Sequence, residues 1–381
     1  MTGVTAAVIS GMFAIIVLAP LRAQSPIPPN APAVQAAPIV PVVRAAPAVQ
    51  HIEKRDGNAV NFDFIVSNPG PDTITLRAIE LIVRDTLGAV VSRRLIDSNG
   101  FGPGIYLVPD RVWAPGATRV VFNPFSTFPD RFSIADLHYT LRFSRASGDP
   151  ELVSDLHVRP VAYRQHAQLT LPVNGTLLVY DGHDFYSHHR RMDYLHPVAQ
   201  GVGISKNFSR YAYDFVRVDG AATMKREGVA GNGAYFGFGE PVLAPAAGIV
   251  VAAVDVQPDN EDGKDYFDPS KLRENPMSLY GNHIVIDHGN GEFSALGHLR
   301  RGSIVVQAGQ RVKQGDVVGQ IGSSGSSFFP HLHYELRTGA GLDVEGLPSV
   351  FDSFLRVYGA IARPGSGAID SGDFVRSTRR H

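Results

Sequence analysis

Cysteine is absent from the chain. Its absence excludes disulfide bridges, thiolate metal sites and a cysteine nucleophile, so any bound metal must rest on histidine and carboxylate ligands. An excess of charge of either sign is also lacking, because 35 Lys and Arg face 36 Asp and Glu and the formal net charge is −1. No basic run stands out along the sequence, so we expect no binding of nucleic acid.

Long apolar runs are lacking except near the N-terminus. Residues 4–20 are almost wholly apolar, and Ala23 offers a small residue for cleavage. This pattern predicts a signal peptide over 1–23. No Lys or Arg precedes the apolar run, and Leu21 stands where a smaller residue is usual, so the alternative is an uncleaved segment that holds the protein at a membrane. Either way, the body of the protein is expected outside the cytoplasm.

Proline and glycine are plentiful, at 27 and 39 residues, and they divide the chain. Residues 24–50 are dominated by Pro, Ala and Val, which predicts a semi-stiff linker of polyproline type. Over 51–166, short alternating runs separated by turn clusters predict an immunoglobulin-like β-sandwich. No chemistry is assigned to the sandwich, which we expect to act as a spacer or to contact a protein partner.

The remainder of the chain predicts a second all-β domain over 167–350. Strand-like runs alternate with glycine turns there, and most of the 14 histidines fall within it. Residues 351–381 are expected to form a C-terminal tail that is frayed beyond Tyr358. The fold class predicted from sequence is therefore all-β, with a β-sandwich followed by an antiparallel β domain.

The most informative stretch is His331-Leu332-His333, which follows the Gly/Ser-rich loop at 322–327. Side chains two residues apart on a strand face the same side, so two imidazoles would share one small volume, about 6.5–7 Å apart at Cα. One imidazole can ligate a metal while the other acts on a water molecule or substrate. Taken alone, this pair could equally lie on a solvated strand face.

Two further residues could join this pair. Asp214 places a carboxylate within the aromatic run 211–215, although a solvated edge position is an alternative. His298 lies between apolar neighbours, where a core histidine is the ordinary interpretation. Together, an Asp and three His on neighbouring strands would make a mononuclear site suited to Zn²⁺.

The order of these motifs resembles the lysostaphin/LytM-type zinc endopeptidases over about residues 200–340. The motifs that carry the resemblance are Asp214, then 244–250 (Ala-Pro-Ala-Ala-Gly-Ile-Val), 281–289 (Gly-Asn-His-Ile-Val-Ile-Asp-His-Gly), 297–299 (Gly-His-Leu), 309–319 and 330–335 (Pro-His-Leu-His-Tyr-Glu). The resemblance implies cleavage of peptide cross-links in bacterial peptidoglycan, in the periplasm or after secretion. It further implies that Asp214 and His333 bind zinc, and that His298 and His331 flank the reacting water.

One position departs from the family pattern. The family has a third zinc ligand, a His, four residues before the Asp, and here that position is Arg210. A guanidinium group is always charged and cannot ligate a cation. The histidine-rich segment 181–191 lies just upstream, so we expect His188 or His189 to supply the third ligand, with His183 as the next candidate.

Two functions follow from these observations. The first is an exported zinc metallo-endopeptidase that acts on peptidoglycan peptides. The second is a non-catalytic domain of the same fold that binds cell wall or regulates another cell-wall hydrolase, and Arg210 is the feature that favours it. The joint presence of Asp214, His298, His331 and His333 favours the enzyme, because a scaffold has no physical need for that set.

Overall fold

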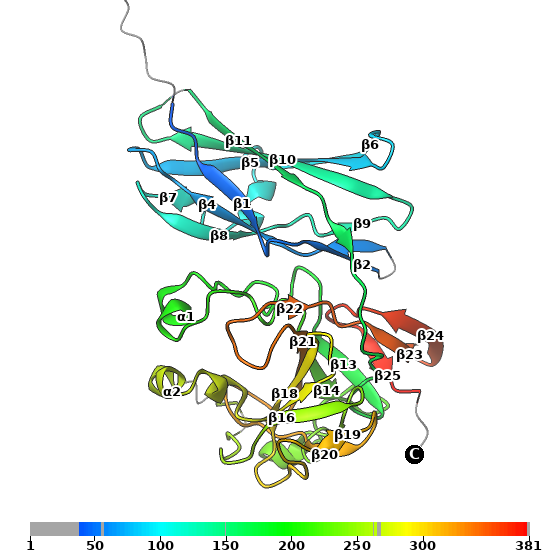
Figure 1. The fold of residues 1–381 in the computed structure, drawn as a ribbon. Coiled ribbons are helices and arrows are strands. Elements are labelled where there is room, and N and C mark those ends of the chain that lie inside the picture. The colour runs from blue at the N-terminus through cyan, green and yellow to red at the C-terminus, as the bar shows by residue number, and fades with distance from the viewer. Residues whose placement is uncertain (1–37, 55–56, 149, 262, 265–267, 379–381) are drawn as a thin grey trace, which may run out of the picture. The chain divides into compact units, whose positions relative to one another are not determined.

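A computed structural model describes residues 38–54, 57–148, 150–261, 263–264 and 268–378 (Figure 1). The signal peptide expected over 1–23 and the first part of the linker expected over 24–50 lie outside these residues. From Ile39 onward the chain forms one compact unit. Within the described ranges, no helix has the length and apolar character needed to cross a membrane.

The first domain consists of three small β-sheets with strand orders β1-β4-β8, β11-β10-β5-β6 and β12-β2-β3-β9, and β7 pairs with β5. Buried and partly exposed residues alternate along the two longest strands, as expected for strands with one face on a core. Phe62, Phe64, Trp113, Tyr139 and Phe143 are among the large side chains of that core. The elements are β1 (Val42–Ala46), β2 (His51–Lys54), β3 (Asn58–Val60), β4 (Asp63–Ser67), β5 (Ile74–Asp85), β6 (Val90–Asp97), η1 (Gly104–Leu107), β7 (Val112–Trp113), β8 (Thr118–Phe122), β9 (Thr127–Phe128), β10 (Ile134–Arg145), β11 (Leu152–Val158) and β12 (Val161–Ala162).

Strand β1 lies within the segment expected to be linker, so the expectation of an extended spacer up to residue 50 is wrong over 42–46. All five residues of β1 pair antiparallel with β4. Val43 and Ala45 pack against the sandwich core. The prolines of this region, Pro41 and Pro47, flank the strand and do not interrupt it, so a strand is compatible with the Pro-rich composition.

The second domain is built on an eleven-stranded sheet with the order β19-β16-β17-β18-β21-β14-β13-β25-β23-β24, in which β22 pairs with β21; β15 and β20 form a separate pair. Its core includes Leu171, Phe215, Ile284, Leu332 and Phe351. The elements are β13 (Thr176–Asp181), α1 (Pro197–Gly201), β14 (Tyr213–Arg217), η2 (Asn232–Ala234), β15 (Pro241–Leu243), β16 (Gly248–Val254), α2 (Pro269–Glu274), η3 (Pro276–Tyr280), β17 (Asn282–Asp287), β18 (Phe293–Leu299), β19 (Arg311–Val312), β20 (Val317–Gln320), β21 (Leu332–Arg337), β22 (Gly346–Leu347), β23 (Phe351–Tyr358), β24 (Ile361–Gly367) and β25 (Phe374–Arg376).

The C-terminal segment is part of this sheet, so the expectation of a tail outside the domain is wrong for residues 351–376, and the expectation of fraying beyond Tyr358 is wrong for β24 and β25. Strand β25 pairs with both β13 and β23, and β23 forms a hairpin with β24. Val375 and Ile369 are fully buried against the same core. These apolar side chains stand among Gly, Ser and Arg, and they anchor a segment whose composition resembles that of a loop.

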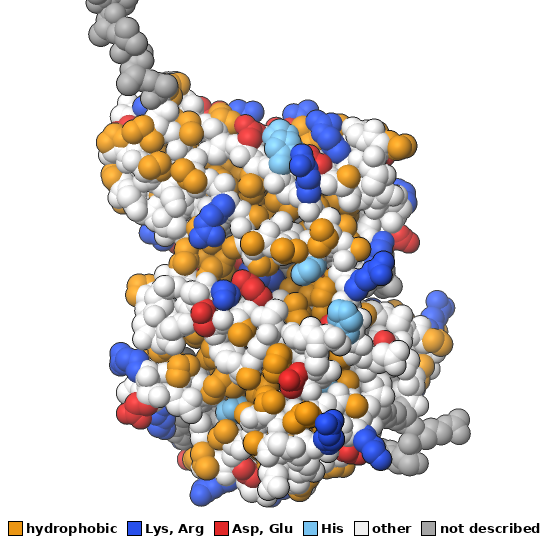
Figure 2. Space-filling model, in the orientation of Figure 1, with side chains coloured by type: hydrophobic (Ala, Val, Ile, Leu, Met, Phe, Trp, Pro, Cys, Tyr) orange, Lys and Arg blue, Asp and Glu red, His pale blue; other side chains and the backbone are white. Residues whose placement is uncertain are grey.

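The all-β fold class is thus confirmed, with only short helices among the described residues. The division into two domains at residue 166 and the immunoglobulin-like sandwich of the first domain stay predictions, and we refer to residues 42–162 as the sandwich. On the face drawn in Figure 2, cationic and anionic side chains are interspersed, in agreement with the nearly neutral composition. The strand neighbourhood β18-β21-β14 is the part of the fold that positions the candidate site.

Candidate metal centre

Strand register brings Asp214 and His333 together. They are direct partners in the β14–β21 ladder, and His333 Nδ1 lies 3.1 Å from Asp214 Oδ1. His331, two residues earlier on the same face, has its Nε2 3.5 Å from the same oxygen. All three residues are buried. The two-residue period of a strand therefore directs both imidazoles toward one carboxylate, as the His-x-His spacing predicts.

His298 reaches the same place from the neighbouring strand β18. Its ring centroid is 4.8 Å from that of His331 and 5.7 Å from that of His333. Its backbone has a φ of 60°, which a non-glycine residue seldom adopts, and such strain is typical of functional positions. The structure thus brings together all four residues that the resemblance singles out.

Backbone carbonyls orient the two histidines expected to be catalytic. His298 Nδ1 lies 2.8 Å from Ser324 O, and His331 Nδ1 lies 2.8 Å from Phe329 O. A carbonyl oxygen can only accept, so each Nδ1 carries a proton, and in a neutral imidazole of this kind Nε2 is the nitrogen with the lone pair. Burial, reinforced by the neighbouring His331 and His333, lowers the pKa of His298 well below its usual value, so this imidazole is neutral near pH 7.

The upstream segment supplies His189 to the cluster. His189 Nε2 lies 3.1 Å from Asp214 Oδ2, and its ring centroid is 4.7 Å from that of His333. Burial lowers the pKa of His189 despite the opposing effect of Asp214, so its imidazole is neutral as a ligand must be. Of the three upstream candidates, His189 has the geometry of the third ligand.

His188 and His183 occupy other environments. His188 Nδ1 pairs with Asp181 Oδ2 at 2.5 Å, and 65% of the His188 side chain is exposed. Both ring nitrogens of the buried His183 are engaged, Nδ1 with Glu53 Oε2 at 2.7 Å and Nε2 with Tyr211 O at 2.8 Å. His188 remains beside the cluster, since Asp181, His188, His189 and Asp214 each offer one ligand atom within 4.8 Å of the others.

Arg210 does not face the cluster. Its Nη1 donates to Asp63 Oδ2 at 2.7 Å, and the side chain is only 1% exposed. Asp63 belongs to β4 of the sandwich. Arg210, at the expected ligand position, therefore forms an ion pair with Asp63 away from the cluster. A third ligand would have to come from a different segment.

The donor set can be tested against a zinc ion. His189 Nε2 is buried and has no hydrogen bond of good geometry among the described residues, although it lies beside Asp214. Two imidazoles and one carboxylate form a ligand set found for catalytic zinc. Burial acts to raise the pKa of Asp214, but His189, His331 and His333 outweigh it and hold this pKa well below its usual value. The residues present therefore fit a zinc ion.

Behind His333 lies a buried polar group that the sequence interpretation missed. His333 Nε2 is 3.8 Å from Glu335 Oε1, and Glu335 in turn accepts hydrogen bonds from Tyr280 and Arg337. A carboxylate behind a metal-binding imidazole fixes its orientation. Glu335 could have been suspected, because it is again two residues further along the strand that carries His331 and His333. No sequence signal pointed to Tyr280.

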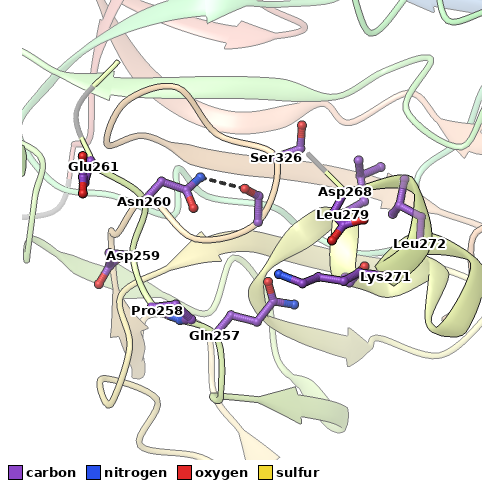
Figure 3. A pocket seen from close by; sticks show the side chains of 12 residues that line it. Gln257, Pro258, Asp259, Asn260, Glu261, Asp268, Lys271, Leu272, Leu279 and Ser326 are labelled. Carbon is purple, nitrogen blue, oxygen red and sulfur yellow. Dashed lines mark hydrogen bonds between the residues drawn. The ribbon is translucent and has the colours of Figure 1, made fainter. Parts of the chain in front are cut away.

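Two cavities adjoin the cluster. One, of about 320 Å³, is lined by His188, His189, Met192, Phe208, Ser209, Leu279, Tyr280, His298, Ser326 and His333. The other, of about 330 Å³, shares Leu279 and Ser326 with the first and is otherwise lined mainly by polar side chains (Figure 3). There Asn260 Nδ2 donates to the carbonyl oxygens of Gly325 and Ser327, which ties this wall to the Gly/Ser-rich loop. The first cavity is thus the one lined by histidines of the cluster, and the second borders it at Leu279 and Ser326.

Comparison with known proteins gives a match to the model of Peptidase family M23 over residues 231–344. This segment contains His298, His331 and His333, whereas His189 and Asp214 precede it. Curated relatives include the DD-carboxypeptidase/endopeptidase Mpg of Neisseria meningitidis, 47% identical over 58 residues, and the peptidoglycan DD-endopeptidase ShyA of Vibrio cholerae, 45% identical over 56 residues. Each of these alignments covers 15% of this chain and only 13% of the relative's length.

A longer alignment joins the chain to a lipoprotein NlpD/LppB homolog of Pseudomonas aeruginosa, 35% identical over 99 residues, which is 26% of each chain. Among solved structures, the catalytic domain of lysostaphin from Staphylococcus simulans is 18% identical and covers 45% of this chain and 88% of that domain, with a TM-score of 0.24.

Proposed function

We propose, from the membership of residues 231–344 in peptidase family M23, that this protein is an exported, zinc-dependent metallo-endopeptidase that hydrolyses peptide bonds of bacterial peptidoglycan. The observation that carries the proposal is the convergence of His189, Asp214 and His333 next to His298 and His331. The names of the peptidoglycan endopeptidases among its relatives support the substrate class. The apolar run at the N-terminus supports export.

His189, Asp214 and His333 would hold the zinc ion. When bound, zinc supplies Lewis acidity and lowers the pKa of coordinated water toward 7. The hydrogen-bonded carboxylate of Glu335 would keep the imidazole of His333 in its ligating orientation.

His331 and His298 would handle the proton and the developing charge. With Nδ1 held by a backbone carbonyl, the Nε2 lone pair of one imidazole can accept a proton from the attacking water. The same nitrogen can return that proton to the leaving amine as the C–N bond breaks. While it holds the proton, this imidazolium can donate a hydrogen bond through Nε2 to the oxyanion of the tetrahedral carbon. The second imidazole, with its Nε2 lone pair, can accept a hydrogen bond from the attacking water and orient it.

A non-catalytic domain that binds cell wall or regulates another hydrolase is the second candidate. It is favoured by Arg210, because that side chain removes a ligand from the position where the family has one. Against it stands His189, which meets Asp214 and His333 from another segment. Zinc content and turnover separate the two candidates.

Purified protein is expected to hold about one zinc per chain and to release soluble fragments from isolated peptidoglycan. Zinc is measured by atomic absorption, and the fragments by chromatography and mass spectrometry. Chelation should abolish release, and added zinc should restore it. Protein that binds zinc but releases no fragments would favour the non-catalytic candidate, and protein without zinc would contradict the metal site.

Zinc affinity is expected to rise with pH. Burial acts to lower the pKa of His333, but Asp214 and Glu335 outweigh it and raise this pKa to about 9 in the metal-free protein. Zinc must displace this proton, so the apparent Kd should fall about tenfold for each pH unit up to about 9. Below pH 6.5 the same proton stabilises the metal-free fold, and that stabilisation is lost as the pH rises through 9. Competition titrations with a chelator at several pH values test this slope; a flat profile would contradict it.

A further inference from the structure

A buried network of charged and polar side chains joins the sandwich to the metal centre. The carboxylate of Asp63 in β4 accepts from two guanidinium groups, Arg190 Nη1 at 2.6 Å and Arg210 Nη1 at 2.7 Å. Arg190 also donates to Asn61 Oδ1 at 3.1 Å and to the carbonyl oxygen of Phe62 at 2.7 Å. Asp63, Arg190 and Arg210 are each no more than 1% exposed, so these charges depend on one another and not on solvent.

The two arginines adjoin the proposed zinc ligands in sequence. Arg190 directly follows His189, and Arg210 lies four residues before Asp214 on the segment that enters β14. One carboxylate therefore fixes both stretches of backbone. A side-chain amide reinforces the link, because Asn207 Nδ2 donates to the carbonyl oxygens of His189 at 3.2 Å and Arg190 at 3.3 Å.

A second buried contact ties the same segments to the sandwich. His183, at the start of the histidine-rich segment, bonds Glu53 through Nδ1 and the carbonyl oxygen of Tyr211 through Nε2. Asn61 Nδ2 donates to Glu53 and to the carbonyl oxygen of His183. The segment 182–191 has no helix or strand of its own. Residues of the sandwich hold it, together with Asn207, Ile369 and Ser371 of the second domain.

We infer that Asp63 is a positioning residue of the metal centre: it holds Arg190 and Arg210 so that His189 and Asp214 stand close enough to share one metal ion. The inference rests on the proposed function of the site as a zinc centre. It also gives Arg210 a role. The family pattern has a His ligand at position 210. Here Arg210 helps instead to position His189, the ligand that we propose in its place. The sandwich is then part of the catalytic apparatus.

Asp63→Asn tests the inference in the full-length protein with zinc as the probe. The change keeps the side-chain shape and removes the charge that faces both arginines. We expect zinc affinity to fall about 10–100-fold, as for other residues that orient metal ligands. The visible spectrum of the cobalt-substituted protein should also change, because the ligand geometry changes. Asp155→Asn is the matched control, since it removes a carboxylate of the same domain that is 54% exposed; it should leave affinity and spectrum unchanged.

Should Asp63→Asn not fold, the double variant Asp63→Asn/Arg210→Met removes one buried cation together with the carboxylate charge and is expected to fold with the same loss of affinity. A folded variant of either kind with wild-type zinc affinity and cobalt spectrum would overturn the inference. Both readouts are independent of hydrolysis. A wild-type protein that binds zinc without cleaving peptidoglycan would therefore refute the proposed function while the Asp63 comparison still decides this inference.

Discussion

His331→Ala is expected to lower kcat for peptidoglycan hydrolysis by about 10²–10⁴-fold while leaving about one zinc per chain. His331 Nε2 lies 3.5 Å from Asp214 Oδ1, and its Nδ1 is held by a backbone carbonyl, so its loss removes an oriented proton acceptor and spares the three ligands. Rates on isolated peptidoglycan and zinc content are measured on the same preparations.

His157→Ala provides the control, because His157 lies in β11 of the sandwich with 53% of its side chain exposed. It should retain wild-type turnover and zinc. Loss of zinc in His331→Ala would reassign this residue as a ligand. Full turnover in His331→Ala would remove it from the mechanism.

His189→Ala is expected to weaken zinc binding by more than about 100-fold and to abolish hydrolysis at limiting zinc. Removing a metal ligand should weaken zinc binding more than removing a residue that only orients a ligand, for which a loss of about 10–100-fold in affinity is typical. His188→Ala is the matched control from the adjacent position. Because His188 pairs with Asp181 and is mostly exposed, its loss should change zinc affinity only a few-fold.

Equilibrium competition with a chromophoric chelator gives both affinities. A larger loss in His188→Ala than in His189→Ala would exchange their roles. Equal and small losses in both variants would mean that the third ligand comes from neither residue.

The part of the site that lies on paired strands could be predicted from sequence, because strand geometry is regular. His331 and His333 share a face by their spacing, and Asp214 meets His333 through the β14–β21 register. His298 could be placed only through the resemblance, since an imidazole between apolar neighbours is ordinarily a core residue. Its positive φ is invisible in the sequence.

The third ligand could be narrowed from sequence to His188 or His189, with His183 as the next candidate, but not to one residue. His183, His188 and His189 lie within a few positions of each other, and no periodicity applies to a segment without regular structure. Their side-chain contacts distinguish them. Glu53 pairs with His183 and Asp181 pairs with His188, whereas His189 lies beside Asp214 in the cluster. For the same reason the strands at 42–46 and 361–376 were missed, because their partners, not their composition, make them strands.

The shared carboxylate of Asp63 also bears on how such a protein can diversify. An accessory domain can be exchanged easily when it contacts its neighbour through a small, polar interface. Here, replacing the sandwich would leave the guanidinium groups of Arg190 and Arg210 without their shared carboxylate. It would also remove contacts that hold the segment with His189. Any domain that replaced the sandwich would have to supply a carboxylate at the position of Asp63.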